Sequence, residues 1–198
     1  MVKTLVVATG NPGKVVEMQA HLAELPINLV LKPDTLEVEE TGTTFQENAR
    51  LKAVQVAVAT GEWAIADDSG LAVDALNGAP GLYSARYGKT NSDRINRLLT
   101  ELGPNPNRSA KFICAVSLAR PDGTIALEAE GYCAGEILRQ PQGIGGFGYD
   151  PIFFVPEQGM TFAEMPTELK RQMSHRGRAL QQLLPKLHHL LTVGDSCL

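Results

Sequence analysis

Cysteine is scarce in this chain of 198 residues, and the three that occur, Cys114, Cys133 and Cys197, include no Cys-x-x-Cys pair. An odd number at such wide spacing argues against a disulfide framework and against a structural zinc site. Cys197 falls in the last few residues, where we expect a frayed tail. The cysteine content therefore favours a protein of the reducing cytoplasm.

Long apolar runs and an excess of positive charge are also missing. Charge-free stretches such as residues 75–85 and 140–149 are far shorter than the ~18 residues of a membrane span. The N-terminus lacks the apolar length of a signal peptide and predicts a strand. Eighteen Lys and Arg against 22 Asp and Glu give a net charge of −4, whereas a nucleic-acid-binding protein depends on a basic surface. We therefore expect neither a membrane nor a nucleic-acid partner.

Hydrophobic patterning predicts strands and helices in alternation. Short β-branched or apolar runs predict strands at residues 5–8, 29–31 and 63–66. A longer hairpin is expected at residues 112–119 and 124–137, because the intervening Pro-Asp-Gly is a turn sequence. A mixed sheet in an α/β fold follows from this order, in a single domain over residues 1–198.

Capping residues predict where the helices begin. Apolar residues at helical spacing predict a helix over residues 15–25. Thr44 and Glu47 form a capping box that starts a second helix, ending near Gly61. Ser92 or Asp93 is expected to cap a third helix, which runs through Leu102. A short helix is expected with Pro166 in its first turn, and Ser174 is expected to cap the last helix.

The loop Thr9-Gly10-Asn11-Pro12-Gly13-Lys14 lies between the first strand and the first helix. Exposed backbone amides, the helix N-terminus and the Lys14 ammonium could together cradle a phosphate. The loop is not a Walker A motif, because Ala8 and Val15 stand where glycine and Ser or Thr are needed. An ordinary strand-to-helix turn with a surface lysine is the alternative.

Acidic residues gather in two places, Glu37, Glu39 and Glu40 in one and Asp67 and Asp68 in the other. Neighbouring side chains of a strand point to opposite faces, so only one of the two aspartates can face a given site, and the other caps or pairs. Carboxylates without nearby His or Cys suit Mg²⁺. The glutamates could equally form a solvated loop, whereas Asp68 follows a predicted strand, where α/β proteins bind ligands.

Two later stretches of the sequence suggest a nucleotide-binding site. Residues 143–150 place four glycines around Phe147 and Tyr149, which suits a backbone wrapped around a flat ligand with Phe147 stacked on its ring. A glycine-rich turn with core aromatics is the alternative. Lys170, His175 and Arg176 surround a helix start, a favourable place for an anion. A metal, several cations and an aromatic shelf together indicate a nucleotide site.

Six ordered segments between residues 9 and 177 resemble the inosine triphosphate pyrophosphatase family, which includes the bacterial dITP/XTP pyrophosphatases. The matching segments are Thr9-Gly10-Asn11-x-x-Lys14, Glu39-Glu40-Thr41-Gly42, Ala66-Asp67-Asp68-Ser69-Gly70-Leu71, Gly78-Ala79-Pro80-Gly81-x-Tyr83-Ser84-Ala85-Arg86-Tyr87, Gly146-Phe147-Gly148-Tyr149-Asp150-Pro151 and Ser174-His175-Arg176-Gly177. The resemblance implies two lobes around a long mixed sheet with flanking helices and a central substrate cleft. It also implies a homodimer.

The implied activity is Mg²⁺-dependent hydrolysis of dITP, ITP and XTP to the monophosphate and pyrophosphate, which keeps these purine nucleotides out of DNA and RNA. Carried over by motif, Glu39 and Asp68 bind Mg²⁺, and Asp68 is the catalytic proton acceptor, either directly or, because a metal-bound carboxylate is a poor base, through a metal-bound water. The residues expected to hold the phosphates are Thr9, Gly10, Asn11, Lys14 and Lys52. Those expected to hold the rest of the substrate are Ser69, Phe147, Gly148, Tyr149, Asp150, Lys170, His175 and Arg176.

Base selection against adenine and guanine is expected to use the 6-oxo group of hypoxanthine and xanthine and their lack of a 2-amino group. We hypothesise that His175 or Arg176 donates a hydrogen bond to this oxygen, which the amino group of adenine cannot accept. Three other functions remain open from the sequence: a pyrophosphatase for modified pyrimidines, a nucleotide-binding regulator without turnover, and, against the charge balance, a nucleic-acid-binding protein.

Overall fold

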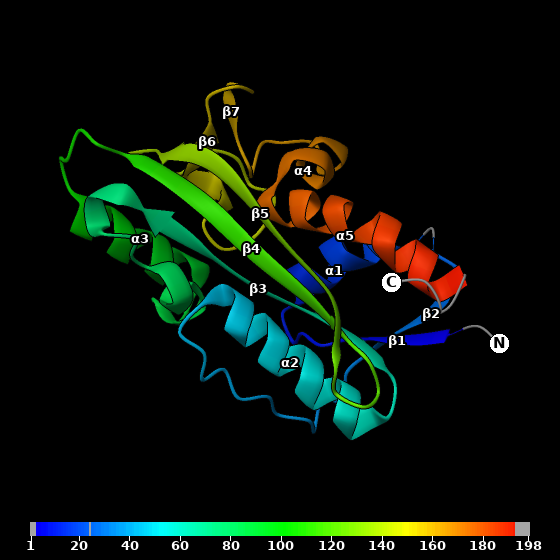
Figure 1. Cartoon of the computed structure of the whole chain (residues 1–198). Helices are drawn as coiled ribbons and strands as arrows, with labels where there is room; N and C mark the ends of the chain where they lie inside the picture. The colour runs from blue at the N-terminus through cyan, green and yellow to red at the C-terminus, as the bar shows by residue number, and fades with distance from the viewer. Residues whose placement is uncertain (1–2, 24, 193–198) are drawn as a thin grey trace. The chain divides into compact units, whose positions relative to one another are not determined.

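The computed structural model describes residues 3–23 and 25–192, so Cys197 lies outside the described residues. Its sheet has seven strands in the order β2-β1-β3-β4-β5-β6-β7 (Figure 1). β1 is parallel to β2 and β3, whereas β6 is antiparallel to β5 and β7. The predicted mixed sheet with flanking helices is therefore confirmed. The strands are β1 (Lys3–Val7), β2 (Ile27–Leu31), β3 (Trp63–Val73), β4 (Ser109–Ala119), β5 (Ile125–Ile137), β6 (Phe153–Val155) and β7 (Met160–Thr161).

Local sequence explains most helix ends. The α-helices are α1 (Pro12–Leu22), α2 (Phe45–Thr60), α3 (Asn91–Leu102), α4 (Thr167–Met173) and α5 (His175–Thr192). The capping box of Thr44 and Glu47 starts α2, and Gly61 ends it in a left-handed conformation, as predicted. α3 is capped by Thr90, with Asp93 as the third helical residue, so the predicted cap at Ser92 or Asp93 is wrong. Pro166 is the N-cap of α4 and not part of its first turn.

β3 is longer than predicted, and this difference matters for the site. The expected strand ends at residue 66, but β3 continues through Asp67 and Asp68 to Val73. Charged residues disfavour a buried strand unless each charge has a partner. Here both carboxylates are paired with cations, which allows the strand to continue. The hairpin of β4 and β5 is as predicted, with Gly123 at a positive φ in the turn.

One compact unit comprises Met1–Asp68, Cys114–Gly131 and Arg176–Leu198, which we call unit 1. In unit 1, α1 and α5 pack on the sheet face that carries Leu5, Val7 and Ile65. α2 packs on the opposite face, which carries Val6, Ala8 and Ala64 (Figure 1). Because side chains alternate along a strand, Asp67 continues the row of Ile65 and Asp68 continues the row of Ala64 and Ala66.

The second unit, unit 2, comprises Ser69–Ile113 and Tyr132–His175. Its core is built around three aromatic rings, with Phe112 at 4.7 Å from Phe153 and 5.6 Å from Phe162, measured between ring centroids. Buried aliphatic residues of β3 and α3, including Leu71 and Leu98, pack against this cluster.

The two cysteines in the described part of the chain, Cys114 and Cys133, are buried and form no disulfide. Among the described residues, no helix combines the length and hydropathy needed to cross a bilayer.

Candidate active site

Asp67 and Asp68 on β3 each bind a lysine from a different helix of unit 1. Lys14 of α1 lies with its Nζ 3.1 Å from Asp67 Oδ2, and Lys52 of α2 lies with its Nζ 2.9 Å from Asp68 Oδ1. The expectation that the two carboxylates face opposite sides of the strand is confirmed. Two residues that are adjacent in sequence therefore organise two separate groups of charges.

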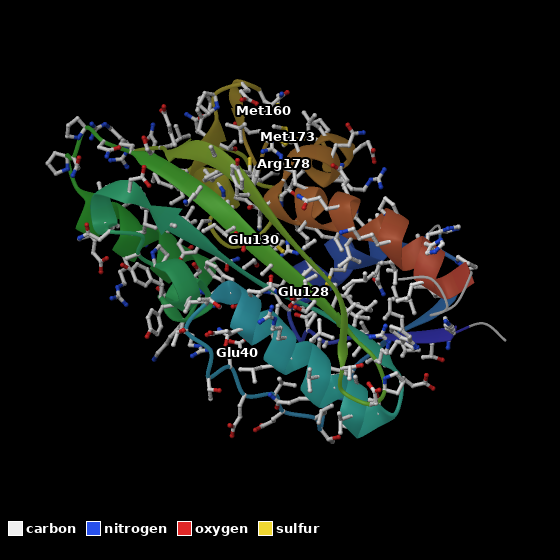
Figure 2. All side chains as sticks on the ribbon, viewed as in Figure 1. Glu40, Glu128, Glu130, Met160, Met173 and Arg178 are labelled. Carbon is white, nitrogen blue, oxygen red and sulfur yellow. The ribbon has the colours of Figure 1, made fainter. Side chains whose placement is uncertain are left out.

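On the α2 face, Asp68 accepts a hydrogen bond on each oxygen. Lys52 Nζ donates to Oδ1, and Asn48 Nδ2 donates to Oδ2 at 3.3 Å. Lys52 also donates to Glu40 Oε1 at 2.8 Å, from the loop that runs beside α2 (Figure 2). Burial by itself would lower the pKa of Lys52, but the charges of Asp68, Asp67 and Glu40 raise it. The ammonium is therefore charged across the physiological pH range.

Asn48 is a site residue that the sequence reasoning did not assign. It is buried, and its Oδ1 accepts a hydrogen bond from the backbone N–H of Gly42 at 2.8 Å. Asn48 and Lys52 are four residues apart on α2, so they share one helix face. Applied to the predicted helix, that spacing was the signal that could have found Asn48.

Gly42 allows the acidic loop to approach α2 closely. A Cβ atom at Gly42 would lie 2.7 Å from Asn48 Oδ1 and 2.7 Å from Glu47 Cβ, closer than ordinary van der Waals contact. Only glycine permits the backbone N–H to reach the Asn48 amide at this distance. The Glu39-Glu40-Thr41-Gly42 segment is thereby fixed against the helix that carries Lys52.

On the other face of β3, Asp67 is completely buried among cations. Arg176 donates to Asp67 Oδ2 through Nη2 at 2.8 Å and through Nε at 3.2 Å, and it also donates to Glu17 of α1. Burial alone would raise the pKa of Asp67, but Lys14, Arg176 and Lys52 hold it well below its usual range. Asp67 is therefore ionised, and the fold compensates its charge with two direct ion pairs.

Arg176 has two carboxylate partners within the protein, and its contact with the purine oxygen stays a prediction. Its side chain is 1% exposed and is bound by two carboxylates, Glu17 and Asp67. The physical reason is the buried charge of Asp67, which needs a buried counter-charge. Sequence patterning placed Arg176 at a helix start but contained no information about this partner.

The loop before α1 also differs from the simplest phosphate cradle. Asn11 caps the helix, and its Oδ1 accepts from the backbone N–H groups of Gly13 at 3.0 Å and Lys14 at 3.4 Å. Thr9 Oγ1 in turn accepts from the Asn11 N–H at 3.2 Å. Because the Asn11 side chain already satisfies two helical amides, the Lys14 ammonium is the stronger candidate for a phosphate partner.

The oxygen donors around Asp68 suit a hard cation. Among the described residues, no three His, Cys, Asp or Glu side chains converge as a metal cluster. Mg²⁺ does not require one, because it takes one or two carboxylates and completes its shell with water and phosphate. Glu39 is exposed, and its backbone N–H and C=O form hydrogen bonds with the side-chain amide of Gln55. Glu40 accepts a hydrogen bond from the Lys52 ammonium, which also donates to Asp68. Glu39 as a metal ligand remains a prediction.

In unit 2 the structure brings Phe147, Asp150 and Lys170 together. Lys170 Nζ lies 2.7 Å from Asp150 Oδ2 and 5.1 Å from the centre of the Phe147 ring. The same Asp150 oxygen accepts from the Phe147 backbone N–H at 2.8 Å. Gly146 has a positive φ, and a Cβ there would clash with Asp150 Oδ2. The glycine-rich loop is thus folded around the carboxylate of Asp150, and the aromatic ring of Phe147 beside it is half-buried.

Two other predicted substrate residues of unit 2, Tyr149 and His175, are buried. Tyr149 is buried and donates its hydroxyl to the Ser84 carbonyl at 2.9 Å, and its assignment to substrate binding stays a prediction. Burial raises the pKa of this hydroxyl. His175 is buried and stacks on Phe112 with 4.7 Å between the ring centroids, and its contact with the 6-oxygen stays a prediction. Ser69 is half-buried on β3, and Gly148 supplies a positive φ.

The chain is closely similar to known proteins over most of its length. The sequence model of the Ham1 family matches residues 5–186. A protein of Nostoc named dITP/XTP pyrophosphatase is 65% identical over 192 residues, covering 97% of this chain and 98% of that protein. A protein of the same name from Synechocystis is 61% identical, covering 91% and 93%. The solved structure of a HAM1 protein from Coxiella burnetii has a TM-score of 0.85 and 43% identity, covering 94% and 98%.

Proposed function

The chain belongs to the Ham1 family, and from this premise we propose that it hydrolyses dITP, ITP and XTP to the nucleoside monophosphate and pyrophosphate. The observation that carries the proposal is the placement of Lys14 and Lys52 on the successive carboxylates Asp67 and Asp68. A nucleotide triphosphate needs cations of this kind to neutralise its charge. The names of the Nostoc and Synechocystis relatives support the same activity.

Phosphoryl chemistry in such a site depends on positioning and on charge neutralisation. Lys14 and Lys52 are the cations that we assign to the phosphates, with Thr9, Gly10 and Asn11 shaping the loop beside them. Lys52 is held between Asp68 and Glu40, so its ammonium is fixed before substrate arrives. No covalent nucleophile is needed for hydrolysis by water.

We assign Mg²⁺ to Asp68 and Glu39, with Glu40 close to the same group of charges. The bound ion would neutralise phosphate charge and lower the pKa of a water in its shell. Asp68 is the residue that orients the attacking water and accepts its proton. The hydrogen bonds from Lys52 and Asn48 fix the direction of its carboxylate, so the water meets an acceptor in a defined position.

For the purine we propose Phe147 as the stacking surface and Lys170 as the donor to the 6-oxygen. Lys170 lies near the Phe147 ring and is held there by Asp150. An ammonium has three N–H donors, so it can bind Asp150 and a purine oxygen together. Adenine carries an amino group at this position, which cannot accept the hydrogen bond. Guanine shares the 6-oxygen, so its rejection rests on its 2-amino group, which hypoxanthine and xanthine lack. The consequence would be hydrolysis of the non-standard purines and their exclusion from DNA and RNA.

The products provide the direct test of this reaction. With ITP and Mg²⁺, ³¹P NMR should show pyrophosphate and inosine monophosphate appearing in equal amounts. Inorganic phosphate together with a nucleoside diphosphate would refute the pyrophosphatase assignment. We further propose a cytoplasmic homodimer; light scattering should then give twice the chain mass of 21.3 kDa, and a monomer would refute the dimer alone.

A further inference from the structure

We infer that Asp67 is a positioning residue, which holds the Lys14 ammonium for the phosphates of the substrate and relies on Arg176 as its permanent counter-charge. The inference rests on the proposed function in one respect, the assignment of Lys14 to the phosphates. It concerns the face of β3 opposite Asp68, to which neither the metal nor the attacking water has been assigned.

The hydrogen bonding of Asp67 is uneven. Lys14 and Arg176 both bind Oδ2, and the thiol of Cys114 lies 3.8 Å from the same oxygen. The other oxygen, Oδ1, is buried and has no hydrogen-bond partner among the described residues. A buried ion pair with an unsatisfied oxygen contributes little net stability compared with apolar side chains of similar size. Stability alone therefore does not account for a carboxylate at this position.

Lys14 is the member of the group that can reach a ligand. Its side chain is 13% exposed, whereas the side chain of Asp67 is fully buried. Lys14 is also in the first turn of α1, beside the Asn11 cap. One of its three N–H groups is sufficient for Asp67, so the others can meet phosphate oxygens. The ion pair thus fixes a long, flexible side chain that would otherwise lose conformational entropy on binding.

Arg176 explains how Lys14 can be shared with a phosphate. If Lys14 were the only partner of Asp67, its movement toward an anion would leave a buried carboxylate without a counter-charge. Arg176 supplies two N–H donors to Asp67 and is itself paired with Glu17. Asp67 therefore stays ionised and fixed whichever position Lys14 takes. This arrangement assigns Arg176 a role in phosphate binding that acts through Asp67 and Lys14.

The test is a double-mutant cycle between Asp67→Asn and Lys14→Met, read as pyrophosphate affinity by titration calorimetry. A lost charge-assisted hydrogen bond changes an equilibrium about tenfold or more, so each single variant should bind pyrophosphate at least about tenfold more weakly. The double variant should be no weaker than Lys14→Met alone, because Asp67 acts through Lys14. Glu128→Gln is the matched control, since it removes a carboxylate from the Arg50 pair elsewhere in unit 1 (Figure 2). It should leave pyrophosphate affinity unchanged.

Unaltered affinity in Asp67→Asn, or fully additive losses in the double variant, would overturn the inference. If Asp67→Asn does not fold, Asp67→Asn combined with Arg176→Gln removes the buried charges together, and it should fold yet bind pyrophosphate weakly. Normal affinity in that variant would equally overturn the inference. If the unaltered protein binds pyrophosphate but hydrolyses no nucleotide, the proposed function is refuted. The double-mutant cycle in pyrophosphate affinity would still test whether Asp67 acts through Lys14.

Discussion

At the scale of single residues, Asp68 is the group on which the proposed chemistry depends most. Its two oxygens accept from Lys52 and Asn48. Asp68→Asn keeps the size of the side chain but removes its charge and its ability to take a proton. We expect pyrophosphate release to fall by about 10²-fold or more, with the fold retained, because Glu40 remains as a counter-charge for Lys52. Activity within about tenfold of the parent would contradict the role of Asp68.

Lys170 is the residue to which we attribute selection against adenine. In Lys170→Met the donor to the 6-oxygen is lost, so kcat/KM for ITP should fall by roughly 10–100-fold while the value for ATP changes little. Arg171→Met is the control, because Arg171 pairs with Glu168 on the surface of the same helix. An equal loss for ITP and ATP in Lys170→Met would indicate a phosphate or structural role.

Asp67 gives a prediction about pH. The pKa of Asp67 is held below its usual range by Lys14, Arg176 and Lys52 against the opposing effect of burial. A carboxyl group with a lowered folded pKa stabilises the fold above its unfolded pKa of about 3.9 and loses this contribution as the pH falls through the folded pKa. Removing one partner of a buried pair typically costs about 3–5 kcal/mol.

Urea unfolding should therefore show Asp67→Asn less stable than the unaltered protein by a constant free energy from neutral pH down to about pH 5. The difference should narrow below about pH 4. A difference that disappears between pH 7 and pH 5 would show that another group, with a higher pKa, controls the stability of this region.

At the scale of elements, α2 connects a capping motif to the site. Thr44 Oγ1 accepts from the Glu47 N–H at 3.1 Å, and the helix that follows carries Asn48 and Lys52. Thr44→Ala should cost about 1 kcal/mol of unfolding free energy and should also raise KM for ITP. Thr90→Ala removes the equivalent capping box from α3 and should cost a similar free energy without changing KM. A matching rise in KM for both variants would contradict the specific role of α2.

Sequence patterning predicted the elements well where the signal is local. The box at Thr44, the stop at Gly61 and the turn at Gly123 depend on short-range hydrogen bonds and on φ, and the structure confirms each of them. The end of β3 was missed because the pairing of Asp67 and Asp68 with cations is long-range. A propensity argument treats two adjacent aspartates as the end of a strand.

The sequence predicted that Asp67 and Asp68 lie on opposite faces of β3, but it did not predict which residues they contact. Alternation along the strand is a local property, so the separation of Asp67 from Asp68 followed directly from the sequence. The partners did not follow, because Arg176 is 109 residues from Asp67 along the chain. For the same reason the sequence alone could not show that Tyr149 and Phe147 have different environments. Tyr149 is a core residue, whereas Phe147 is half-buried.

At the scale of the whole molecule, charge is arranged locally and not as a general surface property. The net charge is −4, yet Lys14, Lys52 and Lys170 each lie beside a carboxylate and are largely buried. Cations held in this way are suited to a small polyanion that enters a defined site. A long polyanion such as DNA would instead require a broad basic surface.

The most direct test of this account is the initial rate of pyrophosphate release from ITP, dITP, XTP, dATP and dGTP, measured with Mg²⁺ and with EDTA. We predict rapid, Mg²⁺-dependent turnover of the first three and much slower turnover of the last two. Equal rates on all five would contradict the proposed base selection. Absence of turnover with tight ITP binding would contradict the enzymatic function itself and indicate a nucleotide-binding regulator.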